Sequence, residues 1–381
     1  MHLIERYATS CGVKIGKPYI YETFFPLPVE KYITFQPFSK YSSKNYDYWQ
    51  EVINYITPYL NKENIKIVQI GKNEDFRFKD TVHICGLTTI SQSASVIRNG
   101  LLHLGADSFA SHVASGMNKK IVAIYSNNNI NNVKPYWTKD EDMILFSAND
   151  ENHKPSYSAE EQSKIINNIK PEDIAKAVLK MLNINYNNLP ETIHFGADYT
   201  QISYEVIPDK DLNPNTILIE NPIIRMDYVF NENFLEEILK IKNAIIFTNK
   251  PIKKSIIEKY KSKIRQLIYV IEEDNDPDFV KLLKNNSITY LLLSFLEENI
   301  LNKFKINYLD YNLIISKKHK TKEDLKIIEV NNLHYKSSRI LISSKGRSIS
   351  KYDWLNNSGD KVIDDPDFWK EADNFYIFKL T

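Results

Sequence analysis

The chain has 381 residues, of which 49 are Lys or Arg and 48 are Asp or Glu, so its formal net charge is +1. This near-neutral balance argues against a general nucleic-acid binder, which needs a strongly basic surface, and two distant cysteines, Cys11 and Cys85, argue against a disulfide framework or a cysteine-based metal site. No apolar run approaches the ~18 residues of a membrane span, and the first residues lack the pattern of a signal peptide, so a cytoplasmic protein is expected.

Apolar runs alternate with amphipathic stretches through the first half of the chain. This alternation is typical of a parallel sheet with crossover helices. Strands are predicted at residues 32–35, 65–70, 82–85, 101–104, 121–125 and 143–146. Helices are predicted at residues 47–60, 90–98, 109–117 and 171–182.

The same alternation resumes after a polar, Asn-rich stretch at residues 183–190, where we place a linker. Strands are predicted at residues 216–219, 244–247, 267–271, 289–293 and 313–315, with helices at 234–241, 252–264, 278–283 and 295–304. From residue 335 the pattern changes, because two predicted strands, 339–342 and 375–378, flank an aromatic and acidic segment. The predicted division is therefore residues 1–185, residues 190–330 and a β-rich tail at residues 331–381.

The most informative stretch is residues 102–126, where a buried strand leads through a short turn into a helix. Asp107 and Ser108 then stand at the carboxyl end of a strand, which is where open α/β sheets bind ligands. The free N–H groups at the helix start suit a diphosphate, and His112 lies one turn further on the same face as Ser108. The alternative is structural: Ser108 is an ordinary helix cap and His112 an ordinary packed histidine.

Five segments, taken in order, resemble the heptosyltransferases, which are glycosyltransferases of the GT-B fold. Residues 105–114 are similar to the family motif Asp-Ser/Thr-Gly-x-x-His-x-Ala. The other segments are residues 35–39 with Lys44, Tyr48 and Trp49, residues 68–75, residues 85–90, and the helix at 169–182. The resemblance covers residues 1 to about 185 and implies two Rossmann-like α/β domains with the nucleotide-sugar domain first.

The resemblance also implies a donor site. Lys44 is expected to contact the diphosphate, where a mobile cation offsets the charge of the leaving group. The other implied donor-site residues are Asp107, Ser108 and the backbone at Phe109 for phosphate or sugar, His112 as support, and Glu74, Thr88 and Thr89 near the nucleoside. No metal and no cofactor are expected, because enzymes of this fold generally use the nucleotide sugar as substrate without a bound metal.

The chain departs from the family pattern in two loops and in domain order. Phe109 replaces the motif glycine that lets a backbone approach phosphate closely, and Phe38 replaces a glycine after Pro37. In the family the donor domain follows an acceptor domain, whereas here residues 1–28 already resemble the connecting segment. The second half is therefore expected to act as the acceptor domain, giving a GT-B-like pair in swapped order.

An acceptor domain that serves an inverting transfer needs a base at the carboxyl end of a strand. Asp227 is the first candidate and Glu220 the second, since both follow the strand predicted at 216–219. Arg225 is able to pair with either carboxylate or to hold an anionic acceptor. The alternative, which we favour, is a local ion pair at the entry to a helix.

Taken together, the sequence predicts a glycosyltransferase that moves a sugar from a nucleoside-diphosphate donor to an unknown acceptor. Glycans, lipid-linked saccharides and modified DNA bases are the acceptor classes considered. Two alternatives stay open: a non-catalytic nucleotide- or glycan-binding protein on a degenerate GT-B fold, and a nucleotide-sugar epimerase or hydrolase.

Overall fold

The computed structural model describes residues 1–149, 154–161, 163–273 and 277–381. The chain forms two units, the first made of residues 1–192 with Thr381 and the second of residues 193–380. The stretch expected as a linker, residues 183–190, precedes this boundary directly.

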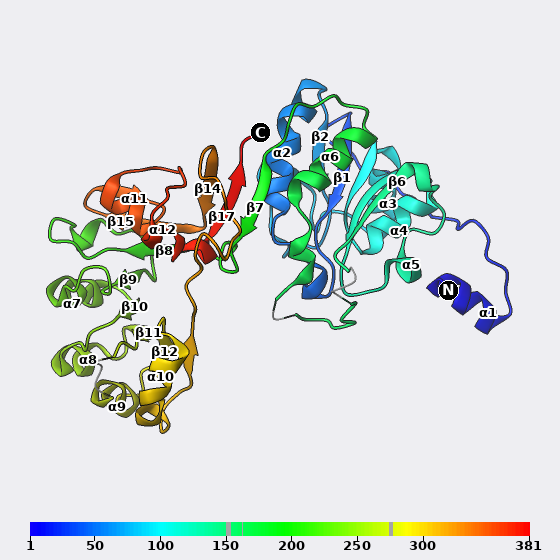
Figure 1. Ribbon diagram of the computed structural model, residues 1–381. Helices are drawn as coiled ribbons and strands as arrows, with labels where there is room; N and C mark the ends of the chain where they lie inside the picture. Colours follow the sequence, from blue (N-terminus) through cyan, green and yellow to red (C-terminus); the bar gives the residue numbers. More distant parts are fainter. Residues whose placement is uncertain (150–153, 162, 274–276) are drawn as a thin grey trace. The chain divides into compact units, whose positions relative to one another are not determined.

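The first unit is built on a six-stranded sheet in which all neighbouring strands are parallel (Figure 1). Its strands are β1 (Tyr32–Gln36), β2 (Lys66–Gln69), β3 (Val82–His83), β4 (Leu102–Ala106), β5 (Lys120–Tyr125) and β6 (Met143–Ser147). The order across the sheet is β3-β2-β1-β4-β5-β6, the doubly wound order of a Rossmann fold. The strands expected in the first half are thereby confirmed.

The helices of the first unit cover both faces of this sheet (Figure 1). They are α2 (Trp49–Lys62), α3 (Ile90–Asn99), α4 (Phe109–Gly116), α5 (Ile130–Val133) and α6 (Pro171–Met181). A further helix, α1 (Leu3–Cys11), has no buried residue. Helices α2 and α6 pack together, as do α3 and α4. Helix α2 buries one apolar stripe that includes Trp49, Val52 and Ile56, which is the stripe that its 3.6-residue periodicity predicts.

Helix α1 was not predicted from the sequence. Its cap is His2, whose ring accepts from the backbone of Ile4 while the Glu5 side chain accepts from the His2 backbone. This is a capping box in which histidine takes the place of the usual Ser or Thr. Because histidine is not one of the residues that usually cap a helix, the ordinary start signals did not indicate α1.

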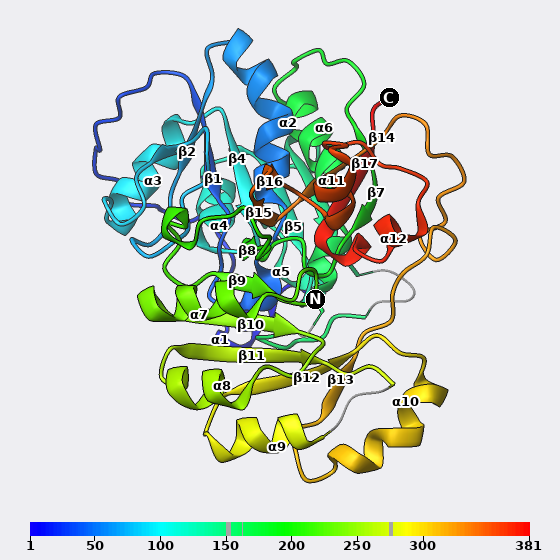
Figure 2. The same cartoon turned by 90° about the vertical axis from the view of Figure 1, so that its left-hand side faces the viewer.

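The second unit contains a larger sheet of eight strands, in the order β13-β12-β11-β10-β9-β8-β15-β16. Its strands are β8 (Ser203–Val206), β9 (Ile223–Arg225), β10 (Ala244–Thr248), β11 (Ile264–Val270), β12 (Tyr290–Ser294), β13 (Ile314–Ser316), β15 (Arg339–Ser343) and β16 (Gly346–Ser348). From β8 to β13 each strand lies beside its predecessor (Figure 2). Because crossovers are right-handed, such an order keeps the connecting helices on one face.

The helices on that face are α7 (Glu232–Ile241), α8 (Lys254–Tyr260) and α9 (Asp278–Asn285), followed along the chain by α10 (Glu298–Phe304). Their buried side chains form one core cluster with the sheet, including Leu235, Ile257 and Val280. The strands β10 and β12 alternate buried and half-buried residues, so the opposite face is less covered. The expectation of a second α/β unit with a parallel sheet is confirmed, although its strand order from β8 to β13 runs in sequence and does not reverse as it does in the first unit.

The last part of the chain is rich in strands, as predicted, but it is not a separate layer. A three-stranded sheet joins β14 (Leu333–Ser337), β17 (Phe375–Lys379) and β7 (Glu191–Phe195), while β15 and β16 complete the eight-stranded sheet. Helices α11 (Lys351–Asn356) and α12 (Pro366–Trp369) lie between these strands in sequence. The aromatic side chains of Tyr335, Phe368 and Phe375 form the small core of this region.

One predicted strand, at residues 216–219, is wrong. Residues 214–216 form a short 3-10 turn that Asn213 caps through its side chain, and the strand begins only at Ile223. Pro214 fits the first position of such a turn because it has no N–H to donate. The apolar run that follows is therefore a loop whose Leu218 is almost fully exposed.

No helix in the part of the chain that the structure describes is long and apolar enough to cross a lipid bilayer.

Gly105 marks a close approach between β1 and β4, and its substitution tests the sheet. A Cβ atom at this position would lie 2.5 Å from the backbone oxygen of Gln36. We expect Gly105→Ala to lower the free energy of unfolding by about 1–3 kcal/mol, because the two strands have to move apart. Gly16→Ala is the matched control, since a Cβ there meets nothing within 4 Å. Equal urea midpoints for the two variants would contradict this packing.

Candidate functional site

The candidate site lies where the strand order of the first unit reverses, between β1 and β4. Helix α2 follows β1 on one face of the sheet and α4 follows β4 on the other. The connections therefore leave in opposite directions. Sheets of this order bind ligands at the carboxyl ends of the two strands, and we call this place the crevice. Gln36 ends β1 and Asp107 directly follows β4, so both side chains stand at this crevice.

A nearly buried ion pair joins the two connections. The Lys44 Nζ atom, at the end of η1 (Ser42–Lys44), lies 2.6 Å from Asp107 Oδ2. The side chains are only 12% and 6% exposed, so water screens their attraction weakly. The Asn128 amide donates to the same oxygen at 3.4 Å. The sequence-predicted residues Lys44 and Asp107 are thus brought together although 63 positions separate them.

The loop that carries Lys44 is fixed by hydrogen bonds around Ser43. Its backbone N–H donates to Ala159 at 3.1 Å and its hydroxyl donates to the Ser158 carbonyl at 2.7 Å. The Ser126 hydroxyl donates to the Ser43 carbonyl at 2.8 Å, and the Asn127 amide donates to the Ser43 hydroxyl at 3.1 Å. The cation is therefore held on a short, well-anchored turn.

The start of α4 is capped from the neighbouring strand rather than from its own turn. Ser108 occupies the N-cap position, but its side chain accepts no hydrogen bond from the helix. Instead its hydroxyl donates to Gln36 Oε1 at 2.6 Å, and the Ala110 N–H donates to the same atom at 3.0 Å. Gln36 was not among the site residues predicted from the sequence. Its position at the end of β1, beside the reversal of strand order, is the signal that would have pointed to it.

His112 lies beside the same carboxylate. Its Nε2 atom is 3.9 Å from Asp107 Oδ1, longer than a hydrogen bond. Burial lowers the pKa of His112, Lys44 and His2 lower it further, and the charge of Asp107 only partly opposes them. The imidazole is therefore neutral at pH 7 and adds no positive charge to the site.

Two buried polar atoms next to the site have no hydrogen-bond partner among the described residues. One is the hydroxyl of Tyr125, at the end of β5, and the other is Nε2 of His103 in β4. Burial, and secondarily the charge of Asp107, raise the pKa of Tyr125 well above its ordinary value. Burial lowers the pKa of His103 to about 3. Both groups stay neutral over the physiological range.

Phe109 stands where the family motif has glycine. It is the first residue of α4, its side chain is 42% exposed, and its φ angle is not positive. The backbone at this position therefore does not require glycine, and the ring contributes an apolar surface at the start of the helix.

The expected nucleoside-side residues lie at the same edge of the sheet but outside the Lys44–Asp107 group. Thr89 caps α3 with a complete capping box, and the Thr88 hydroxyl bonds the Ser93 hydroxyl at 2.8 Å. Glu74 is 73% exposed and lies 3.7 Å from the exposed Lys72. These three side chains have local structural roles or face solvent.

In the second unit, Asp227 forms the local ion pair that the sequence favoured. Both of its oxygens accept from Arg225, at 2.8 and 2.7 Å. Glu220 does not stand at the carboxyl end of a strand as expected: the strand predicted at 216–219 is absent, and Glu220 is exposed and precedes the amino end of β9. Arg225 also donates to Glu205 at 2.5 Å, and its guanidinium lies 3.8 Å from the Tyr228 ring centre.

A second arginine extends this cluster. Arg339 lies 3.3 Å from Glu205 and 3.2 Å from Glu371, and it donates to the Tyr228 hydroxyl at 3.1 Å. Burial raises the pKa of Glu205, but Arg225 and Arg339 outweigh it and hold the carboxyl pKa below its usual value. Such buried charges stay ionised because each has partners, so the cluster is a structural network rather than a pair of free carboxylates.

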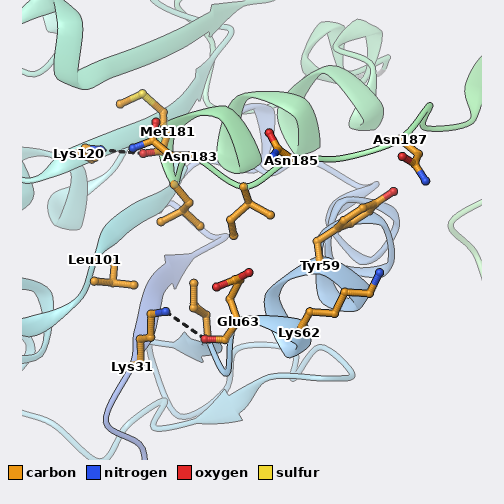
Figure 3. A pocket seen from close by; sticks show the side chains of 13 residues that line it. Lys31, Tyr59, Lys62, Glu63, Leu101, Lys120, Met181, Asn183, Asn185 and Asn187 are labelled. Carbon is orange, nitrogen blue, oxygen red and sulfur yellow. Dashed lines mark hydrogen bonds between the residues drawn. The ribbon is translucent and has the colours of Figure 1, made fainter.

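A separate hollow of about 660 Å³ opens at the opposite edge of the first sheet (Figure 3). Lys31 and Lys120 line it, but their ammonium groups already donate to the carbonyls of Glu63 and Met181, at 3.0 and 2.8 Å. These carbonyls belong to the C-terminal ends of α2 and α6, where cations are favourable. None of the predicted donor-site residues lines this hollow.

The chemistry available at the crevice is electrostatic. Among the described residues, no group of three or more His, Cys, Asp or Glu side chains is arranged to hold a metal ion. The groups that favour an anion are the Lys44 ammonium, the Ser108 hydroxyl and the N–H groups at the start of α4. A cation beside a helix N-terminus is an arrangement that binds phosphate.

Comparison with known proteins points to the same half of the chain. The model of glycosyltransferase family 9 (heptosyltransferase) matches residues 17–166. No curated protein matches.

Three solved structures are among those similar to this chain. A family 9 glycosyl transferase from Veillonella parvula DSM 2008 is 18% identical, with a TM-score of 0.35, over 47% of this chain and 50% of its own. E. coli ADP-heptose LPS heptosyltransferase II is 14% identical, with a TM-score of 0.32, over 47% and 50%. E. coli heptosyltransferase WaaC with ADP is 13% identical, with a TM-score of 0.34, over 48% and 57%. The match spans about half the length of each structure.

The family match, residues 17–166, includes every residue of the crevice described above, from Gln36 and Lys44 to Asp107 and His112. It ends before the second unit begins. Residues 17–166 of this chain are therefore similar to a domain of glycosyltransferase family 9 (heptosyltransferase).

Proposed function

We propose that this protein is a glycosyltransferase that takes its sugar from a nucleoside-diphosphate donor bound at the crevice between β1 and β4. The observation that carries the proposal is the juxtaposition of Lys44, Asp107 and the start of α4 at that crevice. The family match to residues 17–166 supports it. One of the similar structures contains ADP, which makes ADP a natural first ligand to try.

In the proposed reaction an acceptor hydroxyl attacks the anomeric carbon of the donor sugar, and the bond from that carbon to the diphosphate breaks. The electron pair of that bond goes to the diphosphate oxygen, where the Lys44 ammonium and the α4 N–H groups stabilise the new charge. To reach the phosphate, Lys44 gives up part of its interaction with Asp107. Glu74, Thr88 and Thr89 are proposed to lie toward the nucleoside, and His112 to support the pocket as a neutral ring.

A panel of ligands tests the donor site first. We expect ADP or another nucleoside diphosphate to raise the unfolding temperature, because a ligand at ~100 times its dissociation constant stabilises the folded state by ~2.7 kcal/mol. The measurement is thermal unfolding with ADP, UDP, GDP and CDP, and adenosine without phosphate serves as the control. Stabilisation by none of the diphosphates would count against the proposed function.

Lys44→Met tests the place of the site. Loss of a charged hydrogen bond to phosphate should weaken diphosphate affinity roughly tenfold to hundredfold. Lys31→Met is the matched control, because Lys31 also makes one hydrogen bond, to the Glu63 carbonyl, at the far edge of the same sheet. Dissociation constants from calorimetry decide the outcome: equal affinities for the two variants would place the diphosphate elsewhere.

The base that takes the acceptor proton is proposed among Asp227 and Glu220. Asp227 follows β9, but both of its oxygens accept from Arg225. Glu220 precedes β9 and is the more accessible of the two carboxylates, so it is the one to test first. We expect Glu220→Gln to lower the turnover number for transfer at least tenfold while diphosphate affinity stays unchanged. Product analysis with and without candidate acceptors separates the alternatives: free sugar without an acceptor indicates a hydrolase, and binding without any product indicates a non-catalytic protein. An unchanged transfer rate in Glu220→Gln would remove it as the base.

A further inference from the structure

A neutral amide oxygen occupies the place at the start of α4 where an anion would bind. Gln36 Oε1 accepts both from the Ser108 hydroxyl and from the Ala110 N–H, at 2.6 and 3.0 Å. These are the donors that a phosphate oxygen would need at a helix N-terminus. One acceptor already satisfies both donors, so a diphosphate has to compete with a residue of the protein itself.

Independent features of the same crevice also point to an anionic ligand. The Lys44 ammonium is nearly buried, and Asp107 is the carboxylate that compensates its charge. The Tyr125 hydroxyl is buried without a partner among the described residues. Tyr125 follows Ile124, whose carbonyl accepts from the Asp107 N–H at 3.1 Å, so Tyr125 and Asp107 belong to neighbouring strand ends. A buried hydroxyl without a partner costs free energy that a ligand oxygen is able to recover.

We propose that Gln36 is a gating residue of the donor site: its amide oxygen holds the position of a phosphate oxygen and has to move away before a diphosphate binds. The inference rests on the proposed function and adds a regulatory element to the same site. The affinity for polyphosphate is then set by competition, because the ligand has to replace the two hydrogen bonds that Gln36 accepts.

The geometry explains why glutamine suits this task. Its side chain is long enough to reach from the end of β1 to the start of α4. Because the side chain is neutral, it binds the positive end of the helix dipole less strongly than a carboxylate would. A carboxylate in the same place would accept the same two hydrogen bonds and bind the helix start more strongly. It would also repel an incoming phosphate.

Two substitutions test the gate in opposite directions, with inorganic pyrophosphate as the probe so that the nucleoside plays no part. We expect Gln36→Ala to bind pyrophosphate about tenfold more tightly, because the competing oxygen is gone. We expect Gln36→Glu to bind it at least tenfold more weakly near pH 8. That loss should shrink as the pH falls and the new carboxyl group protonates, when each variant is compared with the unsubstituted protein at the same pH.

Asn231→Ala is the matched control for the loss of a helix cap. Asn231 caps α7 in the second unit, where its side chain accepts from the Phe234 N–H at 3.1 Å. We expect Asn231→Ala and Gln36→Ala to lower the unfolding temperature by similar small amounts. Only the Gln36 variants should change the affinity for pyrophosphate.

The outcomes separate the two proposals. If the unsubstituted protein binds pyrophosphate but Gln36→Ala binds it equally or more weakly, the gate is wrong and the donor site stands. If Gln36→Ala binds pyrophosphate and the unsubstituted protein does not, the gating role of Gln36 is supported, because its amide oxygen then prevents binding altogether. If neither the unsubstituted protein nor Gln36→Ala binds pyrophosphate or ADP, the donor site is wrong, and the gate falls with it.

Discussion

The reversal of strand order between β1 and β4 is the constraint on which the first unit depends. Because β2 lies on one side of β1 and β5 lies beyond β4, the two connections must leave toward opposite faces of the sheet. The connections after β1 and β4 therefore begin at the carboxyl ends of two adjacent strands and diverge. In a sheet of this order no helix covers the side chains between the two connections. Gln36, Lys44, Asp107 and Ser108 meet there because of topology, and the contacts among them then decide what the crevice binds.

The local sequence pattern predicted only some of the residues of this site. Asp107 and Ser108 could be found because a strand, a turn and a helix follow one another within about a dozen residues, and Lys44 followed from the family resemblance. Gln36 could not be found in this way, since its hydrogen bond to Ser108 spans 72 positions and depends on strand order rather than on any local signal. The roles of Glu74, Thr88 and Thr89 also stay predictions, because their present contacts are local.

In the second unit, the apolar runs predicted β10 to β13, β15 and β17 but not β8, β9, β14 or β16. They also predicted a strand where a turn with its own capping residue begins, at Asn213 and Pro214. The pair of Arg225 and Asp227 was visible in the sequence because two positions separate them. Its extension through Glu205, Arg339 and Glu371 was not, because these residues come from segments that only the sheet brings together. Local charge pairs are therefore readable in a sequence, whereas networks across strands need the strand order.

The pairing of β7 with β17 has a consequence for the way in which the chain acquires its structure during synthesis. All strands of the first sheet lie within residues 32–147, whereas the three-stranded sheet joins residues 191–195 to residues 375–379. Contacts between segments far apart in the sequence form late, because the entropy cost of closing a long loop comes before the contacts that stabilise it. We therefore expect the first unit to become protease-resistant on a ribosome-bound chain well before the second, whose two ends are joined only when nearly the whole protein has emerged.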